Sequence, residues 1–211
     1  MKARFWFWRR PWQRAKRLLS RAWGPRMVYG WCDADGAWRP HTRVSNTTHI
    51  ESPALLRLAD HVYVGHFNTL DASGGLTLAE GVQVTTHCAL LTHSSHQALR
   101  LAGRAYWGAA DPPGFVREAT AIGAYTFIGP HSVVAPGSRI GRGVLVRAFS
   151  YVSGAVPDFA IVGGQPAQVI GDTRQLDEAW LAAHPHPHPH PHPHPHPQQR
   201  ADYDAWLQST A

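Results

Sequence analysis

An aliphatic residue recurs at every sixth position near the middle of the chain, and this period limits the fold more than any other feature. The positions are Ile122, Ile128, Val134, Ile140, Val146 and Val152. A period of six matches neither an amphipathic helix, which repeats about every 3.6 residues, nor a simple strand, which alternates. It is typical of a solenoid of short strands, each directing one aliphatic side chain inward.

Small or modest side chains stand two residues before most of these positions. They are Thr126, Ser132, Ser138, Val144 and Ser150. A small residue fits the tight interior beside its aliphatic neighbour. One coil cannot bury its own inner face, so we expect several coils to stack.

The same rhythm occurs earlier, with one slip. It runs through Val64, Leu70, Leu78, Val84 and Leu90, and Ser73-Gly74-Gly75 adds two residues to one step. The two blocks are separated by residues 92–121, which include a Gly-, Pro- and aromatic-rich loop at 100–118. Long loops on a rigid scaffold commonly carry function.

These patterns predict an all-β solenoid with segments at both ends. We expect a basic aromatic N-terminal segment (1–26), a solenoid domain (27–171) with the inserted loop (100–118), a C-terminal helix (172–183), a spacer of seven His-Pro pairs (184–197) and a tail (198–211). Pro at every second residue forbids a helix, so the spacer should be extended. A metal-binding tract is the alternative for these histidines.

The positive charge is concentrated at the N-terminus. Residues 1–32 hold nine Lys or Arg and no acid, whereas the rest holds 11 basic and 14 acidic residues. Aromatic and cationic residues alternate in 1–26, which suits peripheral contact with an anionic membrane surface. A frayed leader or a segment packed on a neighbouring subunit are the alternatives. Nucleic acid is not expected as a partner, because the basic residues do not continue into the solenoid.

The two cysteines, Cys32 and Cys88, form neither a disulfide framework nor a zinc knuckle. They suit a reducing cytoplasm. No apolar run approaches the length of a membrane-spanning helix, and the start lacks the apolar stretch of a signal peptide. We therefore expect a cytoplasmic protein, with the N-terminal segment at the inner face of the membrane as a hypothesis.

The sharpest local motif is Thr92-His93-Ser94-Ser95-His96, where the repeat stops. Here the chain resembles the left-handed parallel β-helix acyltransferases of the hexapeptide-repeat superfamily, and most of all their sugar O-acetyltransferase branch, with the galactoside and maltose acetyltransferases. Aligning residues 96–100 with the galactoside enzymes puts His93 on the catalytic position. Residues 162–170 are similar to the family's Gly-x-Pro-Ala-x-x-Ile exit sequence, so the resemblance covers roughly residues 44–175.

The resemblance implies acetyl transfer from acetyl-CoA to a sugar hydroxyl. An imidazole is a suitable base near neutral pH, so His93 is the predicted general base, with Ser94 or a backbone N–H steadying the oxyanion. His96 is the second candidate, as base or as a contact to the acceptor. Asn68 and Asp71 lie close to acceptor-binding positions of related families, and Trp107 of the loop is a further candidate for the acceptor.

The resemblance also suggests where coenzyme A would bind. Pro130, Ala148 and Ser153 fall on positions that contact it in the family. A commonly basic position after Ser153 is Gly154 here, so Arg147 or Arg174 is expected to bind the phosphates. No metal is expected.

In the family the active site lies between subunits, which implies a homotrimer. The predicted function is O-acetylation of a saccharide of a capsule, lipopolysaccharide or exopolysaccharide, with N-acetylation as a close variant. Two alternatives of other classes stay open. One is a non-catalytic solenoid that acts as a scaffold or binding module. The other is a metalloenzyme like the γ-class carbonic anhydrases, for which His61 and His66 have the required spacing.

Overall fold

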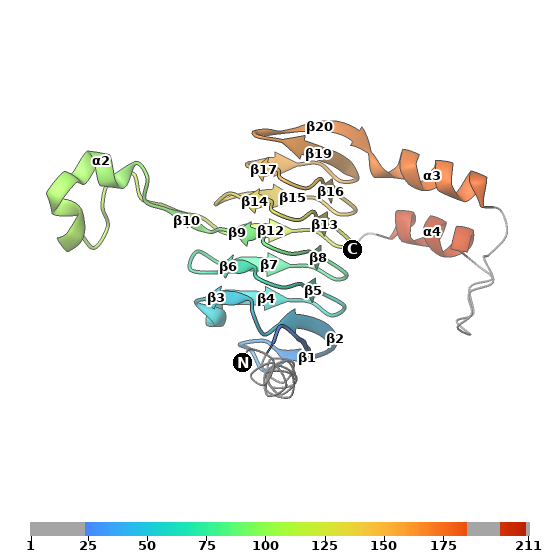
Figure 1. Cartoon of the computed structure of the whole chain (residues 1–211), viewed down its shortest axis with the longest axis horizontal. Helices are drawn as coiled ribbons and strands as arrows, with labels where there is room; N and C mark the ends of the chain where they lie inside the picture. Colours follow the sequence, from blue (N-terminus) through green and yellow to red (C-terminus); the bar gives the residue numbers. More distant parts are fainter. Residues whose placement is uncertain (1–23, 185–198, 210–211) are drawn as a thin grey trace, which may run out of the picture.

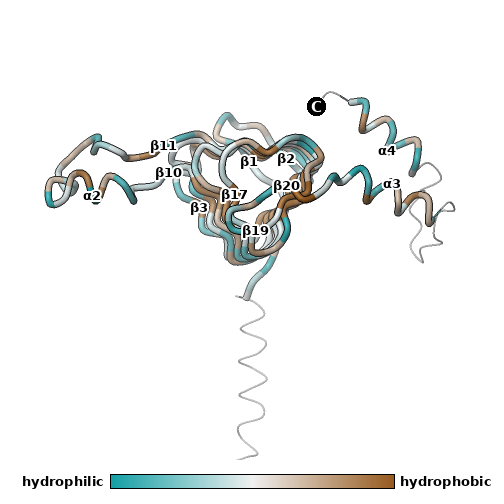
Figure 2. Tube along the Cα trace, turned by 90° about the horizontal axis from the view of Figure 1, so that it is seen from above, coloured by the Kyte–Doolittle hydropathy of each residue, from teal (hydrophilic) through white to brown (hydrophobic). Residues whose placement is uncertain are grey.

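Short strands stack into three parallel sheets, which we call A, B and C. The computed structural model describes residues 24–184 and 199–209. The chain passes through the three sheets in turn, and each circuit adds one strand to each sheet (Figure 1). Seen from above, successive circuits superimpose in one closed outline (Figure 2). The chain therefore coils, as the period of six predicts.

The strands are short, as the spacing of the aliphatic residues requires. Sheet A contains β1 (Met27–Cys32), β2 (Trp38–Ser45), β5 (Tyr63–Val64), β8 (Gln83–Val84), β13 (Phe127–Ile128), β16 (Leu145–Val146), β19 (Ala160–Gly164) and β20 (Ala167–Asp172). Sheet B contains β3 (His49–Glu51), β6 (Thr69–Asp71), β9 (Ala89–Leu90), β14 (Val133–Val134) and β17 (Tyr151–Val152). Sheet C contains β4 (Leu56–Leu58), which follows the turn η1 (Pro53–Leu55), then β7 (Leu76–Leu78), β12 (Thr120–Ile122), β15 (Arg139–Ile140) and β18 (Ala155–Val156).

The core consists of the predicted aliphatic residues in register. In sheet A, Val84, Ile128 and Val146 pair side by side, and each is 0% exposed. Burying each such side chain contributes roughly 1.5–3 kcal/mol. The small residues are buried too, and the hydroxyl of Ser132 donates to the carbonyl oxygen of Arg147 in the next coil at 3.0 Å. The small positions thus link successive coils.

Antiparallel hairpins flank the parallel strands of sheet A at both ends. β1 pairs with β2 across a turn in which the amide of Gly36 donates to the carbonyl oxygen of Asp33, and β19 pairs with β20. The unpaired edge of a solenoid is prone to add further strands, so such terminal elements protect it.

The interruption of the repeat is an arm that projects from the stack (Figure 1). It comprises β10 (His93–Ser94), α2 (Ala98–Ala102), the short helix η2 (Gly103–Gly108) and β11 (Val116–Arg117), with β10 and β11 antiparallel. The arm begins at His93, earlier than the predicted loop at 100–118, because two-residue strands leave no period to detect.

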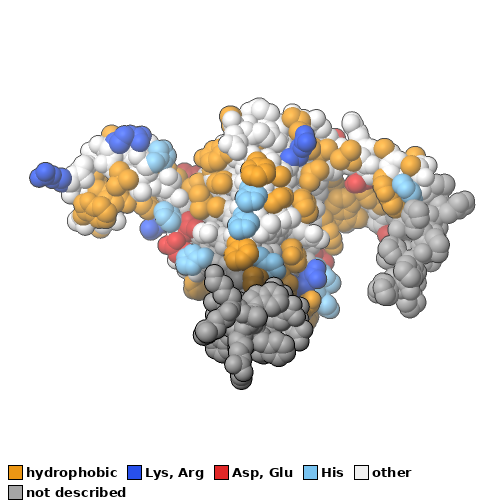
Figure 3. Space-filling view, viewed as in Figure 1, with side chains coloured by type: hydrophobic (Ala, Val, Ile, Leu, Met, Phe, Trp, Pro, Cys, Tyr) orange, Lys and Arg blue, Asp and Glu red, His pale blue; other side chains and the backbone are white. Residues whose placement is uncertain are grey.

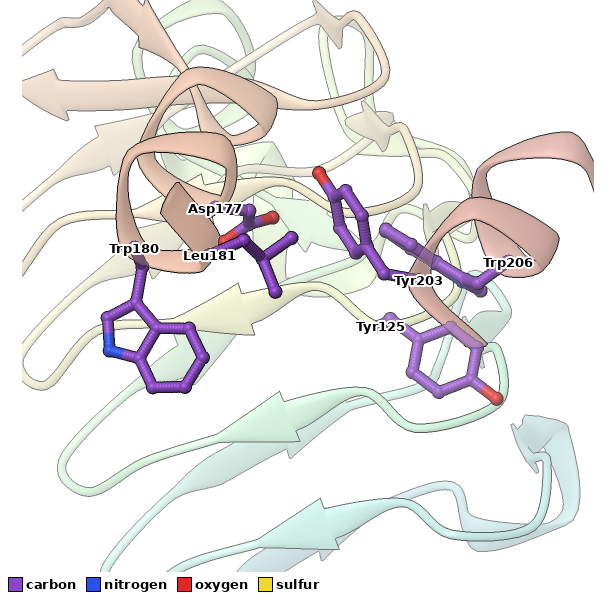
Figure 4. Close-up of a pocket in the computed structure, with 6 residues that line it drawn as sticks. All are labelled: Tyr125, Asp177, Trp180, Leu181, Tyr203 and Trp206. Atoms are coloured by element: carbon purple, nitrogen blue, oxygen red, sulfur yellow. The ribbon is translucent and has the colours of Figure 1, made fainter. Parts of the chain in front are cut away.

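Two helices extend from the opposite side of the stack. α3 (Thr173–Ala183) begins after Asp172, whose side chain accepts a hydrogen bond from the amide of Arg174, and α4 is Gln199–Gln208. Residues of both helices and Tyr125 line a cavity of about 510 Å³ (Figure 4). Within the described ranges, no helix is both long and apolar enough to cross a bilayer. The predicted membrane segment and the His-Pro spacer lie almost wholly outside those ranges.

Aromatic rings stack on one another where the chain turns from sheet A to sheet B. Phe67, His87, His131 and Phe149 come from successive coils, with ring centroids 5.2, 5.0 and 4.8 Å apart. All four have φ near +60°, a conformation that side chains with a Cβ rarely adopt. Figure 3 shows a column of hydrophobic and histidine side chains on this face.

Candidate active site

His93 and Asp71 form a hydrogen-bonded pair at the base of the arm. Asp71 ends β6, and His93 follows β9, the neighbouring strand of sheet B. His93 Nδ1 lies 2.8 Å from Asp71 Oδ2, and the amide of His93 donates to the same oxygen at 3.0 Å. The Asp71 side chain is 2% exposed, whereas that of His93 is 35% exposed. A buried carboxylate thus holds a partly accessible imidazole.

Hydrogen bonds keep Asp71 ionised. Burial would raise its pKa, but donation from the amides and hydroxyls of Ser73 and Thr92 outweighs burial and holds the pKa well below its usual range. A carboxylate only accepts hydrogen bonds, so Nδ1 of His93 carries the proton in this pair. In neutral His93 the lone pair is therefore on Nε2, where a general base needs it.

Ser73-Gly74-Gly75, the segment that adds two residues to the early repeat, lies next to Asp71 and His93 in this site. The amide of Ser73 donates to Asp71 Oδ1 at 2.9 Å, and Ser73 Oγ lies 3.0 Å from His93 Nδ1. The amide of Gly74 donates to Thr92 Oγ1 at 2.8 Å. A Cβ at Gly74 would lie 2.8 Å from the Thr92 carbonyl oxygen, so only glycine fits there. The two extra residues thus place the amide of Ser73 at Asp71 and the amide of Gly74 at Thr92.

The arm covers one face of His93. The ring of Phe115 stacks on the His93 ring with centroids 5.9 Å apart, and the Arg117 guanidinium lies 5.2 Å from the Phe115 centroid. Arg117 is also directly opposite His93 in the ladder of β10 and β11. No ion pair of Arg117 occurs among the described residues. The sequence indicated the loop but not these contacts, because they depend on the pairing of β10 with β11, which brings residues distant in the sequence together.

A cavity of about 290 Å³ lies beside this stack. It is lined by Tyr106, Trp107, Ala109, Ala110, Asp111, Pro112, Phe115 and Arg117. Trp107, predicted to contact the acceptor, is 86% exposed. The cavity combines aromatic surface with a carboxylate and a guanidinium, groups that suit a polyhydroxylated ligand.

Two of the predicted acceptor contacts are structural in the described chain. Asn68 is 1% exposed: its amide nitrogen donates to the carbonyl oxygens of Gly65 and Thr85, and its oxygen accepts from the amide of Cys88. Its polar atoms thus already have partners. Asp71 is buried beneath His93, so it orients the imidazole instead of facing an acceptor. Spacing alone does not distinguish a buried corner residue from one that faces a ligand.

The second histidine of the motif does not join the pair. His96 Nδ1 lies 2.8 Å from Ser94 Oγ, and both residues are at least partly exposed. Among the described residues no carboxylate contacts His96, whereas Asp71 contacts His93. Ser94 follows His93 directly in β10.

The predicted coenzyme A contacts lie at different corners of a single chain. Pro130, Arg147 and Ala148 lie between sheets A and B, whereas Ser153 lies between sheets B and C, the corner of His93. Arg147 is exposed and makes no ion pair within the described residues, so it suits a phosphate. Arg174 is less suited to a phosphate. Two nitrogen atoms of its guanidinium donate to Asp172, and the guanidinium lies over the ring of Phe159.

The histidines of the carbonic anhydrase alternative do not converge. His61 lies between sheets C and A, whereas His66 lies between sheets A and B, with Nδ1 2.6 Å from Ser45 Oγ. Among the described residues, two groups have metal-ligand spacing: His41, Asp60 and His61, and Glu51, Asp71 and His93. Neither contains three histidines.

Part of the coil matches a known family of hexapeptide-repeat sequences. The family described as bacterial transferase hexapeptide (six repeats) matches residues 119–154, the stretch in which the aliphatic period is most regular. The hexapeptide repeat predicted from the sequence is thereby confirmed over this stretch.

Particular relatives carry acyltransferase names. The chain is 27% identical over 151 residues to the probable acetyltransferase Rv3034c of Mycobacterium tuberculosis, covering 70% of the chain and 46% of that protein. It is 36% identical over 63 residues to the putative lipopolysaccharide biosynthesis O-acetyl transferase WbbJ of Escherichia coli, covering 30% of the chain and 32% of WbbJ. The chain thus spans less than half the length of either relative.

A solved structure shares the fold. A mutant of AntD, an N-acyltransferase from Bacillus cereus crystallised in complex with dTDP and coenzyme A, superimposes with a TM-score of 0.52 at 18% identity. The match covers 67% of the chain and 88% of AntD.

Proposed function

We propose that the chain is an acetyl-CoA-dependent O-acetyltransferase that modifies a hydroxyl of a saccharide, with His93 as general base. The observation that carries this proposal is the Asp71–His93 pair, with Nε2 of a partly exposed imidazole left to accept a proton. The acyltransferase names of the sequence relatives support the reaction class.

His93 and Asp71 would act together in the transfer. His93 Nε2 removes the proton of the acceptor hydroxyl while its oxygen attacks the carbonyl carbon of the acetyl thioester. The C–S bond then breaks, and the imidazolium returns the proton to the departing thiolate. Asp71 stabilises the imidazolium between these steps, because its negative charge lies 2.8 Å from Nδ1. A covalent acyl-enzyme is not needed.

We assign the acceptor to the cavity of the arm. Phe115 connects that cavity with His93, because its side chain lines the cavity and its ring stacks on the His93 ring. Trp107 offers an exposed indole on which a sugar ring can pack, and Asp111 and Arg117 offer polar contacts. The name of WbbJ supports a polysaccharide-related acceptor.

Coenzyme A would bind across subunits of a homotrimer. The expected contacts Pro130, Ala148 and Ser153 lie at two corners of one chain, so a single chain offers only part of the groove. Arg147 remains the expected phosphate contact. A left-handed coil, a cytoplasmic location and membrane contact through residues 1–26 belong to this proposal.

The test is acetyl-CoA consumption, followed as thiol release against a panel of sugars and lipid-linked oligosaccharides. We expect acceptor-dependent release that falls by about 100-fold or more in His93→Ala, the loss expected for a general base. His96→Ala is the matched control, because His96 contacts Ser94 but no described carboxylate. It should retain most of the activity.

Each other outcome identifies a different function. Release that survives His93→Ala but not His96→Ala would transfer the base role to His96. No release with any acceptor, together with no binding of coenzyme A, would refute the enzyme and favour the scaffold. Zinc-dependent hydration of carbon dioxide would favour the carbonic anhydrase alternative.

A further inference from the structure

A cluster of two histidines and one aspartate lies on the N-terminal coil, away from His93. His41 belongs to β2, and Asp60 and His61 lie in the turn between β4 and β5. The His41 and His61 rings stack with centroids 4.6 Å apart and planes 1° apart. The candidate ligand atoms of the three residues all lie within 4.8 Å of one another.

The backbone fixes the carboxylate of this cluster. Asp60 Oδ1 accepts hydrogen bonds from the amides of His41 at 2.9 Å and His61 at 3.0 Å. Asp60 Oδ2 points to His41, with Nδ1 2.9 Å away.

We propose that His41, Asp60 and His61 bind a divalent first-row transition metal ion such as Zn²⁺. Nitrogen and oxygen ligands about 2.0–2.2 Å from one ion lie roughly 3 Å apart, close to the separation of His41 Nδ1 and Asp60 Oδ2. The ion would replace the proton between these two atoms. The His61 ring stacks parallel to that of His41, so it would turn to direct a nitrogen at the ion. Two imidazoles favour such a metal over Mg²⁺ or Ca²⁺, which prefer oxygen ligands.

The proposed ion would join segments that are distant in sequence. His41 lies 19 residues before Asp60, so an ion held by both ties the N-terminal hairpin to the following turn. His41 and His61 are exposed, which leaves the remaining coordination positions to water. The bound ion would therefore stabilise the N-terminal end of the coil, independently of the acyl transfer proposed at His93.

Zinc uptake of the full chain tests this site. Equilibrium dialysis against ZnCl₂ should leave the His41→Asn/His61→Asn double variant with one Zn²⁺ per chain fewer than the wild type. The seven His-Pro pairs are present in both proteins, so their contribution cancels in the comparison. Asparagine removes the imidazole but tolerates the positive φ of His61.

The matched control is His87→Asn/His131→Asn, which removes another exposed, stacked pair of histidines; both of these have positive φ, as His61 does. It should keep the wild-type zinc uptake. If the His41/His61 variant does not fold, His41→Asn alone replaces it, since the His41 side chain is 63% exposed. Equal uptake by wild type and variant would overturn the proposal.

Stability provides a second readout. Free Zn²⁺ at about 100 times the dissociation constant should raise the ratio of folded to unfolded wild-type protein about 100-fold, and the control pair should behave alike. The His41/His61 variant should show no such gain. A gain of the same size in that variant would place the stabilising ion elsewhere.

Discussion

Replacing Asp71 by asparagine tests the pair on which the proposed function depends. Asp71→Asn keeps the size of the side chain but removes the negative charge 2.8 Å from His93 Nδ1. If His93 becomes an imidazolium during the reaction, the variant loses the attraction between the two charges. Substrate binding at the arm should change little, because Asp71 is buried.

The magnitude follows from the distance and the burial. Two unit charges about 4 Å apart, the separation appropriate to a charge spread over the ring, attract by about 4 kcal/mol near a protein surface and about 1 kcal/mol in water. Asp71 is 2% exposed and His93 35% exposed, so the true value lies between these limits. A loss of about 3 kcal/mol corresponds to a fall of roughly 100-fold in kcat.

Thiol release at saturating acetyl-CoA and acceptor measures kcat directly. The control is Asp33→Asn, which alters another buried aspartate that accepts hydrogen bonds, including one from the indole of Trp31, but lies in the N-terminal hairpin. It should lose stability and retain kcat. An Asp71→Asn protein that folds and keeps more than about a third of the wild-type kcat would refute the role of the pair.

The same variant has a defined effect on acid stability. The folded pKa of Asp71 is lowered, so its ionisation stabilises the fold above about pH 4 and this contribution is lost as the pH falls. Urea unfolding between pH 3 and 7, roughly the range over which carboxylates titrate, should show a smaller pH dependence for Asp71→Asn than for the wild type. An unchanged pH dependence would contradict the hydrogen bonding described for Asp71.

Three further predictions concern the arm, the core and α4. Phe115→Ala removes the ring stacked on His93 and should lower kcat about 10-fold with little change in Tm; an unchanged kcat would contradict this. Leu70→Ala should lower the free energy of unfolding, measured in urea, by about 2–5 kcal/mol, because Leu70 is 0% exposed. Leu99 is 45% exposed, so Leu99→Ala should lower it by less than about 0.5 kcal/mol. Burial and the nearby Asp177 raise the pKa of Tyr203 to about 12, so ultraviolet titration should show a late tyrosine ionisation, and Tyr203→Phe should lack the step near that pH.

Much of the coil is predictable from the sequence because its interior repeats along a single direction, the axis of the stack. Each coil repeats the environment of the last, so an aliphatic residue such as Ile128 meets its equivalent Val146 directly above it. The period of six therefore reports burial without any knowledge of long-range contacts. The stacked rings at Phe67 and His87 were not foreseen, because their meeting depends on the shape of the corner and not on the period.

The candidate site, too, is predictable from the sequence only in part. The sequence by itself determined the inward aliphatic positions and located His93 at the end of the repeat, since both depend on position within a coil. Only the tertiary structure decided that Asp71 supports His93, that Asn68 is already satisfied by the backbone, and that Phe115 stacks on the imidazole. These contacts join residues of adjacent coils or opposite strands of the arm, and their direction is set by backbone geometry that residue spacing does not encode.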